Sequence, residues 1–504
     1  MKKVVSILLI CVMLVSSLTA CGSKESAGEK GVSVYIESPI ATLDPYGTDD
    51  YVTLYVCSQV YEALIRCNEN GEIIPWLAKS WNISDDGLTY SFELEQGVKF
   101  QNGEELKASD AVYSVYAAKE NAIMDAILGD VESAEATGDY SFELHLKQPN
   151  AGLLALMVDF YIVNEKYDSA QTSRYNTACG TGAYKLREGS VNLSTEVIID
   201  RFDDYHLGAP AIPYAVLKII TDSSTARVQM ETGELDFLMV YSVSNYEPLA
   251  STGNYNTALV NAPHCAYVTW NLEKEPLNNK ALRQALTYAT DKKSINQIAY
   301  EGLAVPATAL FGETSFGADF SNVMDLSFDL EKAKEKLAEA GFPNGLDFDD
   351  YGISIDYIGG SYHEKIANCL QETWSQIGVH VSIQAADNVD CSGGNYTMRT
   401  TGVGFTADMS TSANKYISSC IGSSNYARYS NARVDELFTL AAAESDSATR
   451  KAYYEEVCEI ITEDCPYLCI QHKQIPYVWN KKLNAKVYPS NTSPWYIQDW
   501  SWAE

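Results

Sequence analysis

Basic residues are scarce in this sequence. Its 504 residues include 36 lysines and arginines against 67 aspartates and glutamates, which gives a formal net charge of −31. A nucleic-acid partner requires a stripe or patch of Lys and Arg side chains, and the sequence contains none, so we exclude nucleic-acid binding. We interpret the excess of acidic groups as a feature that keeps an exposed surface soluble.

Motifs of several enzyme and metal-site classes are also missing. The chain has no H-E-x-x-H motif, no Walker phosphate loop and no G-x-S-x-G elbow. Its histidines form no i, i+4 pair, and we interpret each as a surface or satisfied core residue: His145, His206, His264, His363, His380 and His472. Carboxylates distant in sequence could still form a catalytic pair. Nothing positive points to one, so we expect no enzymatic activity, no cofactor and no metal site.

Long apolar runs are confined to the N-terminus. Lys2 and Lys3 precede an apolar stretch, which ends in Leu18-Thr19-Ala20-Cys21. A basic start, an apolar core shorter than the roughly 20 residues of a membrane span, and small residues at the end are typical of a secretory signal. The ending resembles the bacterial lipobox. We therefore expect residues 1–20 to be a lipoprotein signal peptide, Cys21 to carry the lipid and residues 21–31 to be a flexible tether. The alternative is an ordinary secretory signal beside a cysteine.

Cysteine pairs with metal-binding or redox spacing are absent. Of the 12 cysteines, Cys11 lies in the signal and Cys21 in the lipobox, and the other ten are irregularly spaced without any C-x-x-C. Exported proteins usually pair their cysteines. Most of these lie in apolar neighbourhoods, however, where a free thiol acts as a small buried hydrophobe. We therefore expect mostly free thiols.

The remaining sequence alternates between strand and helix patterns. Period-two alternation predicts strands at residues 32–36, 88–94, 141–146 and 379–383. Helical spacing predicts helices at residues 280–289, 330–340, 363–377, 433–443 and 448–461. This alternation is typical of α/β lobes, and the length exceeds what one core usually serves, so two or three domains are expected.

A series of motifs resembles a known family. The series starts with Tyr61-Glu62-Ala63-Leu64-Ile65, Pro75-Trp76-Leu77-Ala78-Lys79-Ser80-Trp81, Ser84-Asp85-Asp86-Gly87-Leu88-Thr89-Tyr90 and Gly97-Val98-Lys99-Phe100. It continues in family order with Gly180-Thr181-Gly182-Ala183-Tyr184, Gly233-Glu234-Leu235-Asp236, Arg283-Gln284-Ala285-Leu286 and Ala340-Gly341-Phe342. Together these motifs resemble the family 5 extracellular solute-binding proteins. These proteins are the oligopeptide, dipeptide and nickel-type receptors of ABC importers.

The resemblance implies a fold. The fold is α/β, a periplasmic-binding-protein-like type II clamshell, with two α/β lobes joined by a two-strand hinge and an extra domain inserted in the first lobe. Lobe I would comprise residues 32–51, 179–271 and 476–504, the insert residues 52–178, and lobe II residues 272–475. The chain would cross between the lobes near Trp270-Asn271 and Ile475-Pro476, where a hinge motion would close the lobes around a ligand.

The resemblance also implies ligand-binding residues. Gly404-Phe405-Thr406-Ala407-Asp408 is similar to the G-W-x-A-D run of oligopeptide receptors, whose aspartate pairs with the α-ammonium group of the ligand. We therefore expect these five residues to contact ligand, the alternative for Asp408 being a cap on a turn. Further candidates are Ile40, Tyr426 and Arg428. Phe405 stands where the family has tryptophan, and the preceding strand offers glycine in place of a basic side chain. This departure puts a fixed carboxylate clamp in doubt.

The predicted function follows from the signal and the resemblance. We expect a monomeric receptor, lipid-anchored at the outer face of the bacterial cytoplasmic membrane, that captures peptides and delivers them to the permease and ATPase subunits of an ABC importer. The lipid would be its only contact with the membrane. Alternatives that stay open are the same role for a metal chelate, haem or an oligosaccharide, a peptide-sensing surface receptor, and a surface peptidase or glycosidase.

Overall fold

The computed structural model describes residues 30–171, 173, 175–240, 242–312, 315–386, 391–444, 446–490 and 492–503. The expected signal peptide, the lipobox with Cys21 and most of the tether lie outside the described residues. Within these ranges, no helix combines the length and the apolar character that a membrane crossing requires. The first described residue, Lys30, accepts a hydrogen bond on its carbonyl from the Trp502 indole at 3.0 Å, so the two described ends are neighbours.

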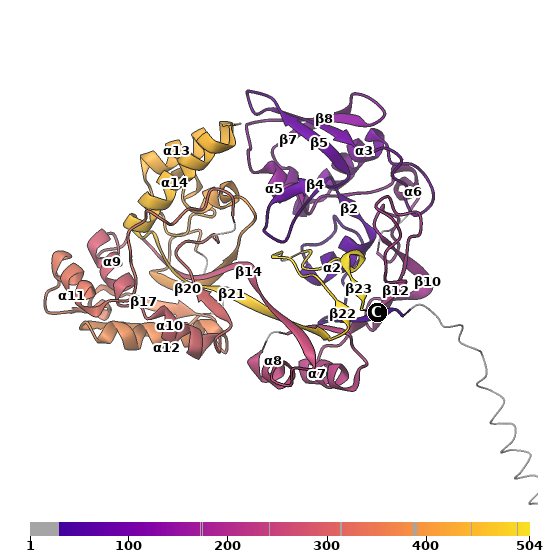
Figure 1. Ribbon diagram of the computed structural model, residues 1–504. Coiled ribbons are helices and arrows are strands. Elements are labelled where there is room, and N and C mark those ends of the chain that lie inside the picture. The colour runs from indigo at the N-terminus through magenta and orange to yellow at the C-terminus, as the bar shows by residue number, and fades with distance from the viewer. Residues whose placement is uncertain are drawn as a thin grey trace, which may run out of the picture.

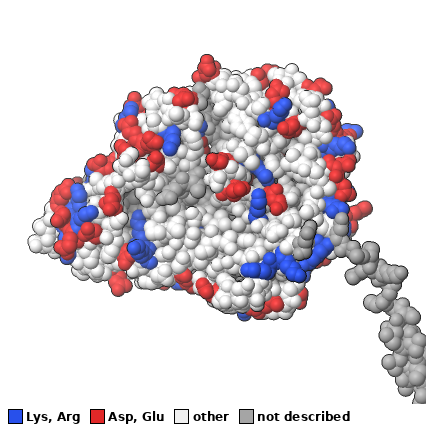
Figure 2. Space-filling view, in the orientation of Figure 1, with Lys and Arg blue, Asp and Glu red and all other residues white. Residues whose placement is uncertain are grey.

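One large sheet runs through two α/β lobes (Figure 1), and the molecular surface is hollowed between them (Figure 2). Acidic side chains are spread over the visible face of both lobes. The sheet has 11 strands, and ten of them follow the order β10-β11-β12-β1-β13-β21-β14-β20-β17-β19. Their bounds are β10 (Tyr184–Asn192), β11 (Glu196–Arg201), β12 (Tyr214–Ile219), β1 (Val32–Ile36), β13 (Phe237–Met239), β21 (Tyr467–Asn480), β14 (Tyr255–Trp270), β20 (Met398–Gly404), β17 (Ser354–Tyr357) and β19 (Ser382–Ala385). The remaining strand, β15 (Ala304–Pro306), pairs with β21.

The antiparallel strands β14 and β21 connect the lobes. They pair from Tyr255↔Asn480 to Asn261↔Gln474, and pairing resumes at Cys265↔His472 after a shift of register. On β14, the residues before the shift pack against the lobe I core and those after it pack in lobe II cores. The crossing in β14 therefore lies at residues 261–265, whereas Trp270, near the crossing expected from the sequence, is fully buried in lobe II.

Lobe I packs its half of the sheet against helices and the C-terminal segment. Its helices are α2 (Tyr51–Val60), α7 (Ser223–Thr232) and α8 (Val243–Ala250), and the C-terminal part forms β22 (Leu483–Asn484), η5 (Ile497–Asp499) and β23 (Ser501–Trp502). Phe237 on β13 packs against Trp500, with ring centroids 4.5 Å apart. The last residues of the chain thus close the lobe I core.

The insert has its own antiparallel sheet, in the order β5-β6-β8-β7. The strands are β5 (Ala78–Ile83), β6 (Thr89–Leu94), β8 (Ser141–Leu146) and β7 (Val131–Ala136), and helix α3 (Ala108–Lys119) contacts β7 and β8. Shorter elements complete the insert: β2 (Glu62–Ala63), β3 (Ile65–Cys67), β4 (Ile73–Pro75), η1 (Ala122–Met124), α4 (Asp125–Leu128), α5 (Leu153–Met157), β9 (Tyr161–Ile162) and α6 (Glu165–Ser169). Phe92 and Phe142 stack at 5.1 Å in its core.

Helix α2 belongs to two cores at once. Every residue of α2 after Tyr51 is buried. Val52 and Tyr55 pack in the lobe I cluster, whereas Leu54 and Val60 pack in the insert cluster. The boundary expected between residues 51 and 52 therefore falls at the start of a helix that both units share.

Lobe II surrounds its half of the sheet with helices. They are α9 (Lys280–Tyr288), α10 (Lys292–Ala299), α11 (Leu330–Glu339), α12 (Tyr362–Ser375), α13 (Ala432–Ala443) and α14 (Ser447–Asp464). Short elements between them are β16 (Leu346–Asp347), η2 (Phe348–Tyr351), β18 (Val379–His380), η3 (Met409–Lys415) and η4 (Ser418–Cys420). The Trp374 indole donates to the carbonyl of Leu286 at 3.1 Å, which ties α12 to α9 inside the core.

The predicted elements agree closely with the observed ones. The strands expected at residues 32–36 and 141–146 are β1 and β8, and the five expected helices are α9, α11, α12, α13 and α14, with ends shifted by at most three residues. The strand expected at residues 379–383 is split into β18 and β19. All ten cysteines of the described chain are free, and seven of them are buried.

Gly182 provides a test of the packing between the insert and lobe I. A Cβ atom at this position would lie 2.5 Å from the carbonyl carbon of Val60 and 2.6 Å from its oxygen. We expect Gly182→Ala to lower the free energy of unfolding by about 1–3 kcal/mol, because the backbone of α2 must move. Thermal unfolding followed by circular dichroism measures the change. Gly359→Ala is the control, because its nearest contact would be Ala385 Cβ at 3.8 Å. Equal melting temperatures for the two variants would contradict the expectation.

Candidate functional site

A cavity of about 250 Å³ lies between the insert and lobe II. Its lining residues form three groups. Tyr51, Cys67, Gly71, Ala155, Val158 and Asp159 come from α2 and the insert; Pro263, Gly404, Phe405, Thr406 and Ala407 come from β14 and the end of β20; Pro489, Ser490 and Thr492 come from the segment after β22. A cavity that contacts both sides of a hinge is the expected place for a ligand in a two-lobed protein. We call it the interlobe cavity.

Four of the residues expected from the sequence line this cavity, and they form one wall. Strand β20 ends at Gly404, and the amide of Phe405 donates to the carbonyl of Pro263 on β14 at 3.0 Å. The Ser315 hydroxyl donates to the Thr406 carbonyl at 2.8 Å, and the Phe316 amide donates to the Ala407 carbonyl at 2.7 Å. These bonds hold the wall rigidly against lobe II before any ligand arrives.

Asp408 follows this wall, but its carboxylate is used elsewhere. It forms an ion pair with Arg450 on α14, and the two side chains are only 6% and 14% exposed. It also accepts a hydrogen bond from the Ser410 amide at 2.9 Å and thereby caps η3. Asp408 is not among the residues that line the cavity. This arrangement agrees with the alternative role of Asp408 as a cap on a turn. Its role as the anchor for a ligand ammonium group stays a prediction, and it requires the Arg450 guanidinium to release the carboxylate.

The other expected ligand residues do not reach the interlobe cavity. Ile40 is 3% exposed and packs in the lobe I core, as its apolar side chain favours. Arg428 pairs with Glu273 at 2.6 Å, and Tyr426 lies under the Lys415 ammonium at 5.4 Å, both within lobe II. In this structure the three side chains serve packing and pairing inside a lobe, and their expected contact with ligand stays a prediction.

Asp159 is the site residue that the sequence analysis missed. It is the one charged side chain among the residues that line the interlobe cavity. The Thr492 hydroxyl donates to its Oδ1 at 2.5 Å, and no cation forms an ion pair with it in the described part of the chain. Burial raises the pKa of the Asp159 carboxyl from 3.8 to about 6, although the bond from Thr492 opposes the shift. A single acid within the apolar run Leu153–Val163 was the available signal.

Three histidines lie in the part of lobe II next to the hinge strands. His264 is on β14, His472 is on β21 and packs against the Phe405 ring at 5.4 Å, and His363 is on α12. Their Nδ1 atoms are buried and have no hydrogen-bond partner in the described structure, which differs from the satisfied core residues expected. Burial lowers the pKa of each to about 4, so they are neutral at pH 7 and add no positive charge near the cavity wall.

One exposed group on the insert could in principle hold a metal ion. The ligand atoms of Glu135, Glu143 and His145 lie within 4.8 Å of one another on β7 and β8. His145 Nε2 already makes a hydrogen bond of 3.4 Å with Glu135 Oε1. These residues line neither the interlobe cavity nor the cavity within lobe II.

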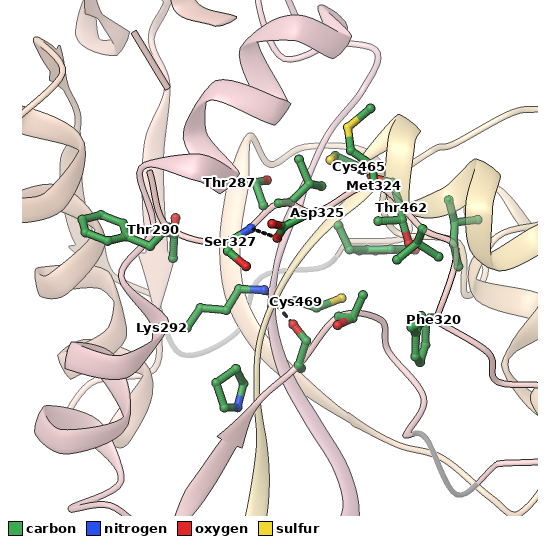
Figure 3. Close-up of a pocket in the computed structure, with 18 of the residues that line it drawn as sticks. Thr287, Thr290, Lys292, Phe320, Met324, Asp325, Ser327, Thr462, Cys465 and Cys469 are labelled. Atoms are coloured by element: carbon green, nitrogen blue, oxygen red, sulfur yellow. Dashed lines mark hydrogen bonds between the residues drawn. The ribbon is translucent and has the colours of Figure 1, made fainter. Parts of the chain in front are cut away.

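A second cavity, of about 610 Å³, lies wholly within lobe II (Figure 3). Its walls come from α9, α10, residues 306–308 and 320–328, α14 and β21. Closure of the lobes would not bury a ligand here, because no lining residue belongs to lobe I or the insert. We therefore assign the hinge-coupled site to the smaller interlobe cavity and treat the lobe II cavity separately.

The ion pair of Asp408 with Arg450 can be tested by its effect on stability. Arg450→Met leaves a nearly buried carboxylate without a cation, and we expect the free energy of unfolding to fall by about 3–5 kcal/mol. The control is Lys451→Met on the same helix, whose half-exposed ammonium is 3.9 Å from Asp319 and should contribute less than about 1 kcal/mol. Urea unfolding measures both. If Arg450→Met is as mild as the control, the pair does not stabilise η3.

Comparison with known proteins places the chain in a family. The profile of the bacterial extracellular solute-binding proteins, family 5 Middle, matches residues 72–425. The dipeptide-binding protein of Escherichia coli K12 is 27% identical over 444 residues, which cover 80% of this chain and 82% of that protein. Heme-binding protein A of Haemophilus influenzae is 26% identical over 454 residues, covering 82% of each chain.

A solved structure of another protein has the same fold. HbpA2 of Haemophilus parasuis superposes with a TM-score of 0.85 at 25% identity, over 94% of this chain and all of that one. The two sequence relatives are named as binding proteins and not as enzymes. The expected type II clamshell is confirmed, and the chain belongs to the family 5 bacterial extracellular solute-binding proteins.

Proposed function

We propose that this protein captures peptides, or small peptide-like molecules with a protonated amino group, in the interlobe cavity and delivers them to the permease and ATPase subunits of an ABC importer. The observation that carries the proposal is the carboxylate of Asp159 in a cavity lined by no Lys or Arg side chain. Members of family 5 bind peptides and work with ABC importers, and one relative is a dipeptide-binding protein.

The charge of the cavity favours an ammonium group. A carboxylate in a closed, water-poor site gains about 1.5–3 kcal/mol from a charge-assisted hydrogen bond, and an α-ammonium group supplies up to three such donors. A carboxylate on the ligand would be repelled by Asp159 and finds no cation among the lining residues. Haem carries two carboxylates and no ammonium group that could pair with Asp159, so this cavity disfavours it relative to a peptide, whose ammonium group offsets its single carboxylate.

The size and the wall of the cavity favour the amino end of a peptide. A volume of about 250 Å³ is slightly below the roughly 300–1,000 Å³ of pockets that enclose whole drug-sized ligands. The backbone of Gly404 to Ala407 lies along one wall, and only its N–H and C=O groups that are not already bonded within lobe II can pair with an extended ligand. With no fixed partner for the carboxyl end, the site sets no single peptide length.

Two carboxylates near the same wall are candidates for the ammonium anchor. Asp159 lines the cavity from the insert side without a cationic partner, whereas Asp408 lies behind the wall and is paired with Arg450. Breaking an existing ion pair costs part of the free energy that the ligand would supply. We therefore propose Asp159 as the primary anchor and keep Asp408 as the family-derived alternative.

We also propose that the lipid on Cys21 is what holds the protein at the membrane. The full sequence has a formal net charge of −31, and a protein this acidic is repelled by anionic lipid headgroups. A lipid anchor supplies the attraction that the protein surface lacks. This position would keep the receptor beside its permease at the outer face of the bacterial cytoplasmic membrane.

Native mass spectrometry of the full chain, purified from cells in mild detergent, tests the solute class. We expect added masses that fragment into amino-acid ions, because a closed cleft retains its ligand through purification. A haem, a metal chelate or a sugar as the retained mass would contradict the proposal and favour the corresponding alternative solute.

The role of Asp159 can be tested by substitution and by pH. We expect Asp159→Asn to weaken binding of a dipeptide such as Ala-Phe about tenfold or more, since a lost charge-assisted bond is worth roughly 1.5–3 kcal/mol. The ionised carboxylate is the form that binds. Because burial raises its pKa to about 6, affinity should fall as the pH is lowered from 7 to 5. The variant should lose this dependence on pH.

Calorimetric titrations with the dipeptide include controls that distinguish Asp159 from Asp408 as the ammonium anchor. Asp139→Asn, at an exposed position of the insert, should bind like the original protein. N-acetylated Ala-Phe, which lacks the ammonium group, should bind at least tenfold more weakly. A large loss in Asp408→Asn together with an unchanged Asp159→Asn would transfer the anchor role to Asp408.

A further inference from the structure

We propose that lobe II contains a second ligand site, independent of the interlobe cavity, that binds a small organic anion with one negative charge and an apolar body, with Lys292 as the charge partner. This site goes beyond the proposed function, because none of its residues belongs to the interlobe cavity. It is the 610 Å³ cavity of Figure 3. This volume lies within the roughly 300–1,000 Å³ range of pockets that bind small molecules.

The Lys292 ammonium group has hydrogen-bond donors that the described part of the protein does not use. Its side chain extends from the start of α10 into the cavity, toward Cys469 (Figure 3). The ammonium donates to the carbonyl of Ala307 at 2.6 Å, and no ion pair joins it to a carboxylate within the described ranges. An ammonium group has three donors, so this bond leaves donor capacity toward the cavity. Lys292 is partly buried, so its ammonium loses part of its hydration without gaining a counter-ion, and an anionic ligand would reduce that cost.

A second polar group in the same cavity also lacks a partner. Thr462 on α14 is 6% exposed, and its Oγ1 atom forms no hydrogen bond in the described structure. It lines the cavity from a different wall than Lys292. A buried hydroxyl without a partner costs about 1–3 kcal/mol, and a ligand oxygen would satisfy it. The cation and the hydroxyl are independent observations that point to a polar ligand group.

The rest of the lining decides the class of ligand. Much of it is apolar: Phe320, Val323, Met324, Leu326, Phe328, Ile461, Cys465 and Cys469. Met324 and Phe328 are 37% and 43% exposed, so the segment that covers the cavity presents apolar side chains to solvent. Lys293 lines the cavity as well, and its charge and that of Lys292 are balanced by those of Asp291 and Asp325. A lining without net positive charge disfavours a dianion such as a phosphate monoester. The combination suits a monocarboxylate with an aromatic or branched aliphatic body.

The test is a calorimetric titration of the full chain with 3-phenylpropionate as the probe. We expect saturable binding, at least tenfold weaker binding to Lys292→Met, and at least tenfold weaker binding of the uncharged 3-phenylpropanamide. The control is Lys334→Met, which removes an exposed lysine of lobe II outside the cavity and should leave the affinity within about twofold. Absence of saturable binding, or equal binding to Lys292→Met, would overturn the proposal.

Two further measurements keep the result decisive. If Lys292→Met fails to fold, as judged by circular dichroism, Thr462→Val replaces it as the test variant. This substitution leaves the Lys292 charge in place and keeps the shape of the residue 462 side chain while removing its hydroxyl group. A severalfold weaker affinity supports the site, and an unchanged affinity opposes it. Ala-Phe should not compete with 3-phenylpropionate, and Asp159→Asn should still bind the probe. Competition would show that the probe occupies the interlobe cavity, which overturns this proposal while leaving the peptide receptor intact.

Discussion

The antiparallel pairing of β14 with β21 is the constraint on which the rest of the structure depends. Both strands run through the two lobes, so one backbone ladder fixes how the lobes face each other. The shift of register between Asn261 and Cys265 removes regular pairing over a few residues, and a ladder bends most easily where its hydrogen bonds are interrupted. Pro263 lies in this interval and accepts the bond from Phe405, so the wall of the interlobe cavity is attached at the point where bending is easiest.

The electrostatics of the site follow from which carboxylates already have partners. Asp408 is committed to Arg450 and to the cap of η3, and its charge is largely neutralised within lobe II. Asp159 has only the Thr492 hydroxyl, and the neighbouring histidines are neutral because burial lowers their pKa. A cavity with one unneutralised acid and no base selects for positive charge. In lobe II, the Lys292 ammonium bonds to a backbone carbonyl and has no carboxylate partner in the described structure, so this part of its cavity selects for negative charge.

Local patterns in the sequence predicted much of the fold, but they could not predict contacts between residues that are distant in sequence. Helical spacing located α11, α13 and α14 because one face of each is buried. Gly404 to Ala407, which the family resemblance predicts to contact ligand, line the interlobe cavity. The long strands β14 and β21 were not predicted, because they are buried by different neighbours along their length and show no single alternation. Asp159 meets Thr492 across 333 residues, and Asp408 meets Arg450 across 42, so neither pairing leaves a local signal.

The sharing of α2 between two cores has a consequence for cooperativity. Val52 and Tyr55 face lobe I while Leu54 and Val60 face the insert, so neither core can lose this helix without exposing apolar surface of the other. Lobe I and the insert therefore form one unfolding unit, despite their separate sheets. Lobe II is joined to them through the sheet at β14 and β21 and has hydrophobic cores of its own. An inserted domain in this chain is thus an extension of its host and not a detachable module.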